Sequence, residues 1–243
     1  MRLLKIVFGC YAFVIFLCSL LIVFPCYYLV FKLSAESKAP ARAHAISRSW
    51  AQFLFTFYLV HYKIKNKHLI DPDKTYVFVA NHRSMLDIPL FARSCTNTFR
   101  FLSKAELAKI PLLGYVIKKL YITVDRDNSR DRSRSIDTMR KTIEENISVF
   151  LCPEGTRNTS DKPLLPFKDG AFRLAIATQT PVAVLTIFDS DKFLPPNSIA
   201  LTPGTIHAVW SEPIETKGMT EADVDALKRK AASVMTELLE SRN

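Results

Sequence analysis

Residues 76–87 read Tyr76-Val77-Phe78-Val79-Ala80-Asn81-His82-Arg83-Ser84-Met85-Leu86-Asp87, an apolar run that ends in a polar corner. A short apolar run bounded by polar residues is typical of a buried strand. A second apolar segment follows at 88–92, so the polar residues lie where a strand passes into a helix. In α/β proteins, binding and catalytic side chains gather at such strand ends.

His82 and Asp87 in this corner are a candidate general base and its orienting carboxylate. An imidazole accepts a proton near neutral pH, and a carboxylate on one ring nitrogen fixes its tautomer. The other nitrogen is then left for a substrate hydroxyl, as in a triad that lacks its protein nucleophile. The alternative is structural: Ser84 caps the following helix, Asp87 completes a variant capping box, and His82 is an ordinary loop residue.

A second polar cluster, Pro153-Glu154-Gly155-Thr156-Arg157, follows the apolar run 147–152, which also reads as a buried strand. Gly155 permits close approach of the backbone to a ligand, and Thr156 offers a hydroxyl. Arg157 offers a planar fork that matches phosphate oxygens. The cluster is therefore a candidate phosphate site, and the alternative is an ordinary turn with a surface ion pair.

Apolar strand-like segments alternate with helical periodicity along the rest of the chain, which predicts an α/β sheet with short loops. A short alternating stretch near Tyr62 opens this part of the chain. The expected strands are 76–80, 99–102, 121–124, 148–152, 182–188 and 206–210, and the expected helices are 132–146, 170–178 and 220–240.

The N-terminus carries a long apolar segment, because no charged residue occurs from Ile6 to Phe31. As a continuous helix this segment measures about 39 Å, more than the roughly 30 Å core of a bilayer. A signal peptide is the alternative, but its apolar region is normally only ~7 to 15 residues. Positive charges flank both sides, so they leave the orientation open, and a straight span competes with a re-entrant helix bent near Pro25.

Residues 32–49 are basic and rich in Ala and Ser, which predicts a connector lying against anionic head groups. Aromatic residues then recur at helical spacing from Trp50 to Tyr58. This favours an interfacial helix at 50–61, with an ordinary buried helix as the alternative. The expected organisation is a membrane-anchoring part at 1–61, embedded at 6–31, and a catalytic domain at 62–243.

The composition of the chain limits the classes of molecule that it can bind. The chain has 33 Lys and Arg against 23 Asp and Glu, a net charge of +10, which favours an anionic partner. The apolar N-terminus favours a membrane surface over nucleic acid, for which no binding motif is present. The five cysteines follow no zinc or disulfide spacing, so we expect reduced thiols facing a cytosol. Neither a nucleotide-binding glycine motif nor a Gly-x-Ser-x-Gly elbow occurs.

Four short blocks occur in order along the chain: Asn81-His82-x4-Asp87, Asp125-Arg126, Pro153-Glu154-Gly155-Thr156-Arg157 and Thr180-Pro181-Val182. In order and spacing they resemble the blocks of the glycerolipid acyltransferase family, and most of all those of 1-acylglycerol-3-phosphate acyltransferases. The resemblance covers about Lys63 to Trp210. Two positions depart from the family pattern: Cys152 stands where an aromatic residue is usual, and Asn66 where glycine is common. These departures bear on the preference for acyl chain or lysolipid.

The resemblance implies an α/β fold in which a central, largely parallel or mixed sheet is flanked by helices. It implies acyl transfer from acyl-CoA or an acyl-carrier protein to the sn-2 hydroxyl of 1-acylglycerol-3-phosphate, giving phosphatidic acid. His82 acts as base and Asp87 orients it, with no cofactor and no metal. The implied substrate-binding residues are Asn81, Lys104, Arg126, Glu154, Gly155, Thr156 and Arg157. The expected location is a bacterial inner membrane, with membrane phospholipids as partners and the catalytic domain in the cytosol.

Three other functions remain open from the sequence. A sister acyltransferase would use the same base on another lysolipid, such as a lyso amino-acid lipid. A thiol hydrolase would use Cys152 as nucleophile, although thiols in apolar strands are usually inert. A non-catalytic module would only dock its basic face on a lipid surface.

Overall fold

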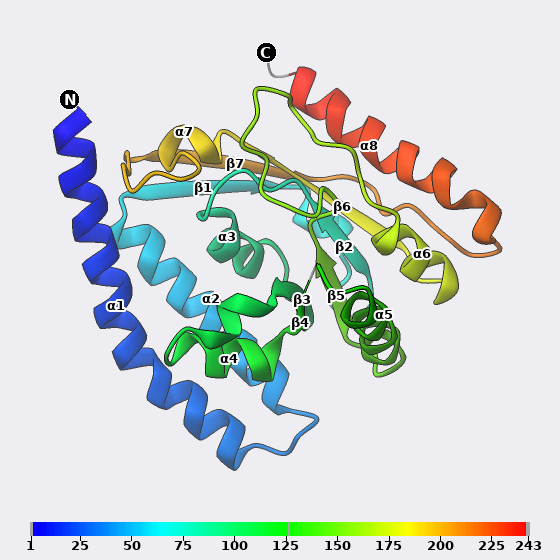
Figure 1. Ribbon diagram of the computed structural model, residues 1–243, viewed down its shortest axis with the longest axis horizontal. Coiled ribbons are helices and arrows are strands. Elements are labelled where there is room, and N and C mark those ends of the chain that lie inside the picture. Colours follow the sequence, from blue (N-terminus) through cyan, green and yellow to red (C-terminus); the bar gives the residue numbers. More distant parts are fainter. Residues whose placement is uncertain (1, 126, 242–243) are drawn as a thin grey trace.

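The computed structural model describes residues 2–125 and 127–241, and its seven strands form one sheet flanked by helices (Figure 1). The strands are β1 (Val60–Lys65), β2 (Val77–Ala80), β3 (Phe99–Lys104), β4 (Ile122–Val124), β5 (Ser148–Leu151), β6 (Val182–Phe188) and β7 (Gly204–Trp210). The α-helices are α1 (Arg2–Leu33), α2 (Ala39–Phe57), α3 (Asp87–Ser94), α4 (Leu113–Leu120), α5 (Ser129–Glu144), α6 (Gly170–Ala177), α7 (Ser190–Phe193) and α8 (Val224–Glu240). Short 3-10 helices lie at Lys67–Leu69, Ala105–Lys109 and Glu221–Asp223.

The strand order is β1-β7-β6-β2-β5-β3-β4, and the described neighbours are parallel except β6 and β7. Strands β2 to β6 therefore run in one direction and end at one edge of the sheet. Strands β1 and β7 run the opposite way. The expected α/β fold with a largely parallel, mixed sheet is confirmed.

The sheet forms because its central strands are apolar on both faces. Phe78 of β2 and Phe150 of β5 point into a core layer covered by α2 and α3, which contribute Phe55 and Phe91. Val77 and Val79 and their neighbours point into a second layer, under α5, α6 and α8 (Figure 1). Continuous apolar runs of this kind are what a parallel sheet covered on both faces requires.

Six strands were expected with defined bounds, and their observed ends differ from the predicted ones by no more than two residues. The helices expected at 132–146, 170–178 and 220–240 correspond to α5, α6 and α8. The last of these starts later than expected, because a 3-10 turn at Glu221–Asp223, closed by a Thr220–Asp223 capping box, precedes it.

The connector expected at 32–49 is wrong for most of its length, because α2 begins at Ala39. Pro40 lies in the first turn, where a missing N–H costs no helical hydrogen bond. Ala43 and Ser47 lie on the buried face of α2, and the Ser47 hydroxyl oxygen lies 2.7 Å from the hydroxyl oxygen of Tyr27 in α1. Packing against α1 therefore extends α2 well before the aromatic residues that predicted it.

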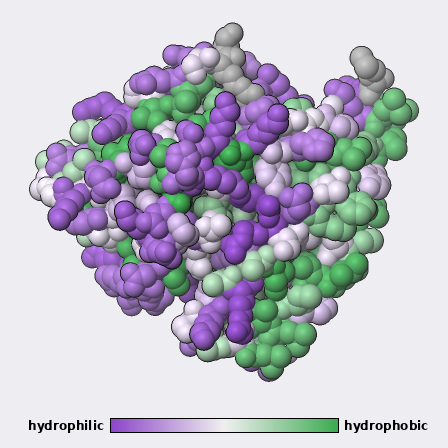
Figure 2. Space-filling view, turned by 180° about the vertical axis from the view of Figure 1, so that it is seen from behind, coloured by the Kyte–Doolittle hydropathy of each residue, from purple (hydrophilic) through white to green (hydrophobic). Residues whose placement is uncertain are grey.

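Helix α1 continues through Pro25 as one helix and is long and apolar enough to cross a bilayer. Within its 18-residue window of high hydropathy, only 22% of the residues are buried in the protein. Leu3 and Leu33, near its two ends, are 72% and 76% exposed. Figure 2 shows this apolar surface as a band along one side of the molecule, with polar residues covering most of the remaining visible face.

The inner face of α2 also buries a histidine. His44 is 1% exposed, its Nε2 atom lies 2.5 Å from the Phe99 carbonyl oxygen, and its ring contacts the Phe99 ring at a centroid distance of 4.5 Å. Burial lowers the pKa of His44 to about 4, because the charged imidazole loses its hydration. His44 is therefore neutral in the folded protein.

We expect His44 to make folding sensitive to acid. Its pKa is lower in the folded than in the unfolded chain, so its contribution to stability is complete above about pH 6.5 and is lost as the pH falls toward 4. At pH 5 the free energy of unfolding should be about 2 kcal/mol lower than at pH 8 because of His44. Chemical denaturation at both pH values measures it. His44→Gln should lose this part of the pH dependence, whereas His61→Gln, at an exposed position of β1, should keep it. A slope unchanged in His44→Gln would contradict the assignment.

Candidate active site

The polar corner and the second polar cluster lie side by side because β2 and β5 are neighbours in the sheet. Segment 81–87 follows β2, and segment 153–157 follows β5 at the same edge. Lys104 ends β3, the next strand along, and Asp125 follows β4. Arg126, expected as a phosphate ligand, lies outside the described residues. The topology thus gathers these segments along one edge of the sheet, whereas the fourth block, Thr180-Pro181-Val182, opens β6 at the opposite edge.

His82 and Asp87 are paired. The Nδ1 atom of His82 lies 2.8 Å from Oδ2 of Asp87, which is fully buried as the first residue of α3. The same oxygen accepts hydrogen bonds from the backbone N–H groups of Arg83 and Ser84, at 2.9 and 2.8 Å. The His82 side chain is 15% exposed, and its Nε2 atom has no hydrogen-bond partner among the described residues. The carboxylate therefore fixes the ring, and Nε2 is left to act on a ligand.

Glu154 is buried and bonded to backbone on both sides of the site, and the substrate-binding role expected of it stays a prediction. It is 2% exposed, and one of its oxygens accepts the His82 backbone N–H at 3.2 Å. The other accepts the Leu165 backbone N–H at 2.8 Å. Burial raises the pKa of Glu154, and the two amides oppose that shift by stabilising the carboxylate. With both oxygens occupied, this side chain holds the His82 segment to the loop after β5.

The Asn81 side chain is also bonded to backbone. Its side-chain amide donates to the Ile187 carbonyl oxygen at 2.8 Å, and its carbonyl accepts from the Ile187 backbone N–H at 2.8 Å. The residue is 1% exposed. Asn81 therefore joins the end of β2 to β6, and its role in substrate binding stays a prediction.

The remaining residues of the cluster differ in backbone conformation and in exposure. Gly155 has a φ angle of +74°, a conformation that side chains with a Cβ rarely adopt, and this sets the turn of the loop. Thr156 is exposed and Arg157 is half-buried. Arg157 forms no ion pair with any described carboxylate. Lys104 is half exposed, and its amino group lies 3.0 Å from Glu106, so its charge is partly neutralised.

The comparisons with known proteins agree with this arrangement. The family model described as acyltransferase matches residues 61–187, from β1 to the end of β6. The chain belongs to the acyltransferase family. This acyltransferase carries the paired His82 and Asp87 and the loop after β5 inside the matched region.

Individual relatives extend the likeness over most of the chain. The crystal structure of the 1-acyl-sn-glycerophosphate acyltransferase PlsC from Thermotoga maritima matches with a TM-score of 0.79 and 25% identity, over 99% of this chain and 95% of that one. An uncharacterised acyltransferase of Schizosaccharomyces pombe is 32% identical over 73% of this chain and 65% of its own length. The human 1-acyl-sn-glycerol-3-phosphate acyltransferase beta is 30% identical over 70% of this chain and 62% of its own length. Matches to these two relatives thus span less than two thirds of their length.

The sequence did not single out Arg83, whose side chain joins the segment after β2 to the loop after β5 and to α7. Its Nε atom donates to Asp191 at 2.8 Å, and its Nη atoms donate to the carbonyl oxygens of Lys162 and Ser160, at 2.8 and 3.0 Å. A further backbone bond runs from Asn158 N–H to the His82 carbonyl, at 2.8 Å. Because all these partners are distant in sequence or are backbone atoms, no spacing signal marks Arg83.

Metal ligation was not expected from the sequence. Within residues 2–125 and 127–241, no group of three or more His, Cys, Asp or Glu side chains is arranged to hold a metal ion. The polar groups described at this edge include an oriented imidazole, buried carboxylates, backbone amides and cationic side chains. Such a site can remove a proton from a hydroxyl and bind an anion beside it.

Proposed function

We propose that this acyltransferase moves an acyl chain from a thioester to the sn-2 hydroxyl of 1-acylglycerol-3-phosphate and so makes phosphatidic acid. One observation carries the proposal: the Asp87-oriented imidazole of His82 lies at the same sheet edge as the loop that presents Arg157. A base for a hydroxyl and a cation for a phosphate thus occur together. The names of the human and Thermotoga relatives support the same acceptor.

The reaction needs no covalent acyl-enzyme. Nε2 of His82 takes the hydroxyl proton while the acceptor oxygen attacks the thioester carbonyl carbon. The developing positive charge on the imidazole is stabilised by Asp87, 2.8 Å away. The tetrahedral intermediate then collapses, the carbon–sulfur bond breaks, and the thiolate leaves and takes the proton from the imidazolium. The products are the new ester and a free thiol, and the base is restored.

The acceptor phosphate is placed against Arg157, with Lys104 nearer the next strands. An arginine fork binds phosphate oxygens with two parallel hydrogen bonds, so it fixes orientation as well as charge. Arg126 remains part of this proposal from the sequence alone. The donor in the proposal is a thioester of coenzyme A or of an acyl-carrier protein.

The test of the acceptor is Arg157→Gln. We expect kcat/KM for 1-acylglycerol-3-phosphate to fall by about 10- to 100-fold, because one charge-assisted phosphate contact is worth about 1.5–3 kcal/mol. Activity with monoacylglycerol, which lacks the phosphate, should stay within about twofold of wild type. The assay uses purified protein in detergent, with acyl-CoA and acyl-carrier protein tested in parallel.

Arg140→Gln is the matched control, because Arg140 is exposed on α5 and away from the sheet edge. It should leave both activities unchanged. An equal loss with both acceptors in Arg157→Gln would instead favour an acceptor without a phosphate, such as a lyso amino-acid lipid. No transfer by wild-type protein with either donor would favour a non-catalytic lipid-binding module.

We propose helices α1 and α2 as the membrane attachment expected at 1–61; the helix expected at 50–61 ends at Phe57, because Val60 already begins β1 of the sheet. The start of α1 is held to the loop before β7, where the Leu201 N–H donates to the Lys5 carbonyl at 3.1 Å. Its other end packs on α4, where Phe24 and Phe31 contact Tyr115 at centroid distances of 5.7 and 6.1 Å. A helix fixed at both ends to the sheet domain lies along it, so we propose that its apolar band inserts into the membrane surface (Figure 2).

The catalytic domain is proposed to face the cytosol. All five cysteines are free thiols. A chain whose cysteines form no disulfide suits a reducing compartment. A lipid acceptor would then reach His82 from the membrane surface while the thioester donor arrives from the aqueous side.

A further inference from the structure

A basic pocket lies at the opposite edge of the sheet from His82. Its volume is about 320 Å³, and it is lined by Arg48 of α2, Lys67 after β1 and Arg93 of α3, with Cys95 and Thr96 between them. Strand β1 runs against β2, so its end lies at the edge where β2 begins. Helix α3 starts beside His82, and its eight residues carry the chain about 12 Å toward this far edge. The pocket is therefore separate from the active site.

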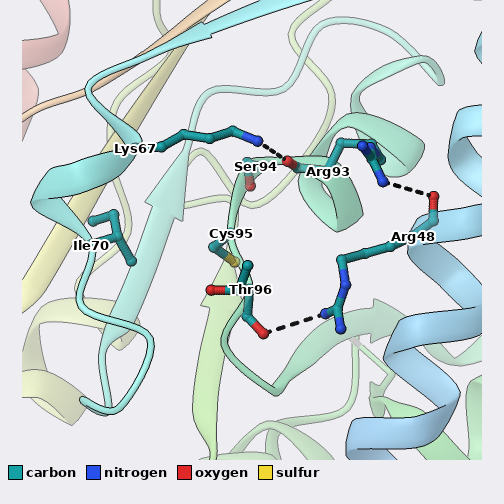
Figure 3. Close-up of a pocket in the computed structure, with 7 residues that line it drawn as sticks. All are labelled: Arg48, Lys67, Ile70, Arg93, Ser94, Cys95 and Thr96. Carbon is teal, nitrogen blue, oxygen red and sulfur yellow. Dashed lines mark hydrogen bonds between the residues drawn. The ribbon is translucent and has the colours of Figure 1, made fainter.

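Three cationic side chains from three different elements line this pocket, and each head group is turned toward a backbone carbonyl oxygen (Figure 3). Lys67 Nζ donates to the Arg93 carbonyl at 2.7 Å, and Arg48 donates to the Thr96 carbonyl at 3.3 Å. Arg93 is held by the Tyr62 hydroxyl, at 2.7 Å from its Nε atom, and stacks over the Tyr62 ring at 5.6 Å. These contacts fix the three cations in place before any ligand arrives.

No negative charge balances them within the described part of the chain. None of the three cations forms an ion pair with a described carboxylate. The thiol of Cys95 does not supply a charge either, because burial raises its pKa to about 12. Partial burial and the charge of Arg93 lower the pKa of Lys67, so the cations disfavour one another. The three positive charges are held near one another by bonds to neutral carbonyl groups. A bound anion would reduce the repulsion between them.

The size and the donors indicate which anion. Each arginine uses few of its five N–H donors on the protein, so planar forks remain for a tetrahedral oxyanion. A cavity of about 320 Å³ holds more than a carboxylate or a halide. We propose that this pocket binds a phosphate monoester, carried by a lipid head group or by a soluble molecule. The proposal is independent of the function assigned to His82.

The test measures phosphate binding by thermal shift on the full chain in detergent. All variants carry Arg157→Gln, which removes the phosphate contact proposed at the other edge. In this background, inorganic phosphate should raise the melting temperature above that in sodium chloride of equal ionic strength. Adding Arg48→Gln and Lys67→Gln should weaken binding roughly 30-fold, at about a fivefold loss for each cation.

The matched control adds Arg229→Gln and Lys230→Gln instead, which removes the same two kinds of charge from the exposed face of α8. It should bind phosphate as the background does. Lys67→Gln alone serves if the double variant folds poorly, since Lys67 is exposed and bonds only a backbone carbonyl; it should lose about fivefold. Equal phosphate affinity in the pocket variants and the control would overturn the proposal.

Two further arms identify the source of the phosphate. Phosphatidylcholine vesicles with and without phosphatidic acid test the lipid head group by co-sedimentation, and glycerol 3-phosphate tests the soluble form by thermal shift. Selective loss of binding to the phosphatidic acid vesicles in the pocket variants supports the lipid source. Selective loss of glycerol 3-phosphate binding supports the soluble source. If the pocket variants lose neither vesicle binding nor glycerol 3-phosphate binding, the proposed site is overturned.

Discussion

Replacing His82 with alanine is expected to lower kcat for acyl transfer by about 10³-fold, with the KM for 1-acylglycerol-3-phosphate little changed. Proton removal by a positioned base contributes about 10²- to 10⁴-fold, and the proposed reaction has no other base within the polar corner. The acceptor contacts of Arg157 are not altered, so binding should survive. Steady-state kinetics with saturating thioester measures both parameters.

His61→Ala is the control for this experiment, because His61 is an exposed histidine of β1. It should retain wild-type kinetics. The melting temperature of His82→Ala must show that the variant is folded at the assay temperature, since the ring lies mostly buried between Asp87 and Phe91. A folded His82→Ala enzyme within tenfold of wild type would remove the general base from the mechanism.

Asp87→Asn is expected to lower kcat by about 10²-fold and to destabilise the fold. The asparagine oxygen can replace Oδ2, which accepts from His82, Arg83 and Ser84, but it brings no negative charge to stabilise the imidazolium. Its amide group then takes the place of Oδ1, a buried atom with no hydrogen-bond partner among the described residues. A buried donor without a partner costs about 1–3 kcal/mol, which chemical denaturation will measure.

A double-mutant cycle separates the catalytic loss from the structural one. If Asp87 acts on the reaction through His82, Asp87→Asn should cause no further loss of kcat in the His82→Ala background. The loss of stability should remain in that background, because the buried amide is still present. If the losses in kcat of the two single variants multiply in the double variant, Asp87 affects activity by a route other than the imidazole.

The sheet could be predicted from the sequence because its central strands are uniformly apolar. Val182–Phe188 is buried at all seven positions and was predicted with its observed ends. The early start of α2 could not be predicted, because Ala43 and Ser47 look like connector residues until α1 packs on them. Helix α4 was not predicted, since eight residues bounded by irregular backbone at Leu112 give too short a periodic signal.

For the candidate site, the spacing of His82 and Asp87 predicted a pairing that the structure has at 2.8 Å. The sequence could not distinguish side chains that face a ligand from side chains that hold the surrounding backbone in place. Asn81 and Glu154 are polar residues beside the site, yet every polar atom of their side chains is occupied by backbone. That distinction depends on burial and on partners from β6 and from the loop after β5, which only the folded chain brings together.

The bonds of Arg83, Glu154 and Asn158 join the base and the loop after β5 into one mechanical unit. Displacing that loop must also displace the imidazole. Substitutions can therefore change the choice of acceptor without lowering the rate only at side chains that do not take part in these bonds, such as those of Thr156 and Arg157. Loop insertions or deletions between Asn158 and Lys162 would instead change selectivity and turnover together.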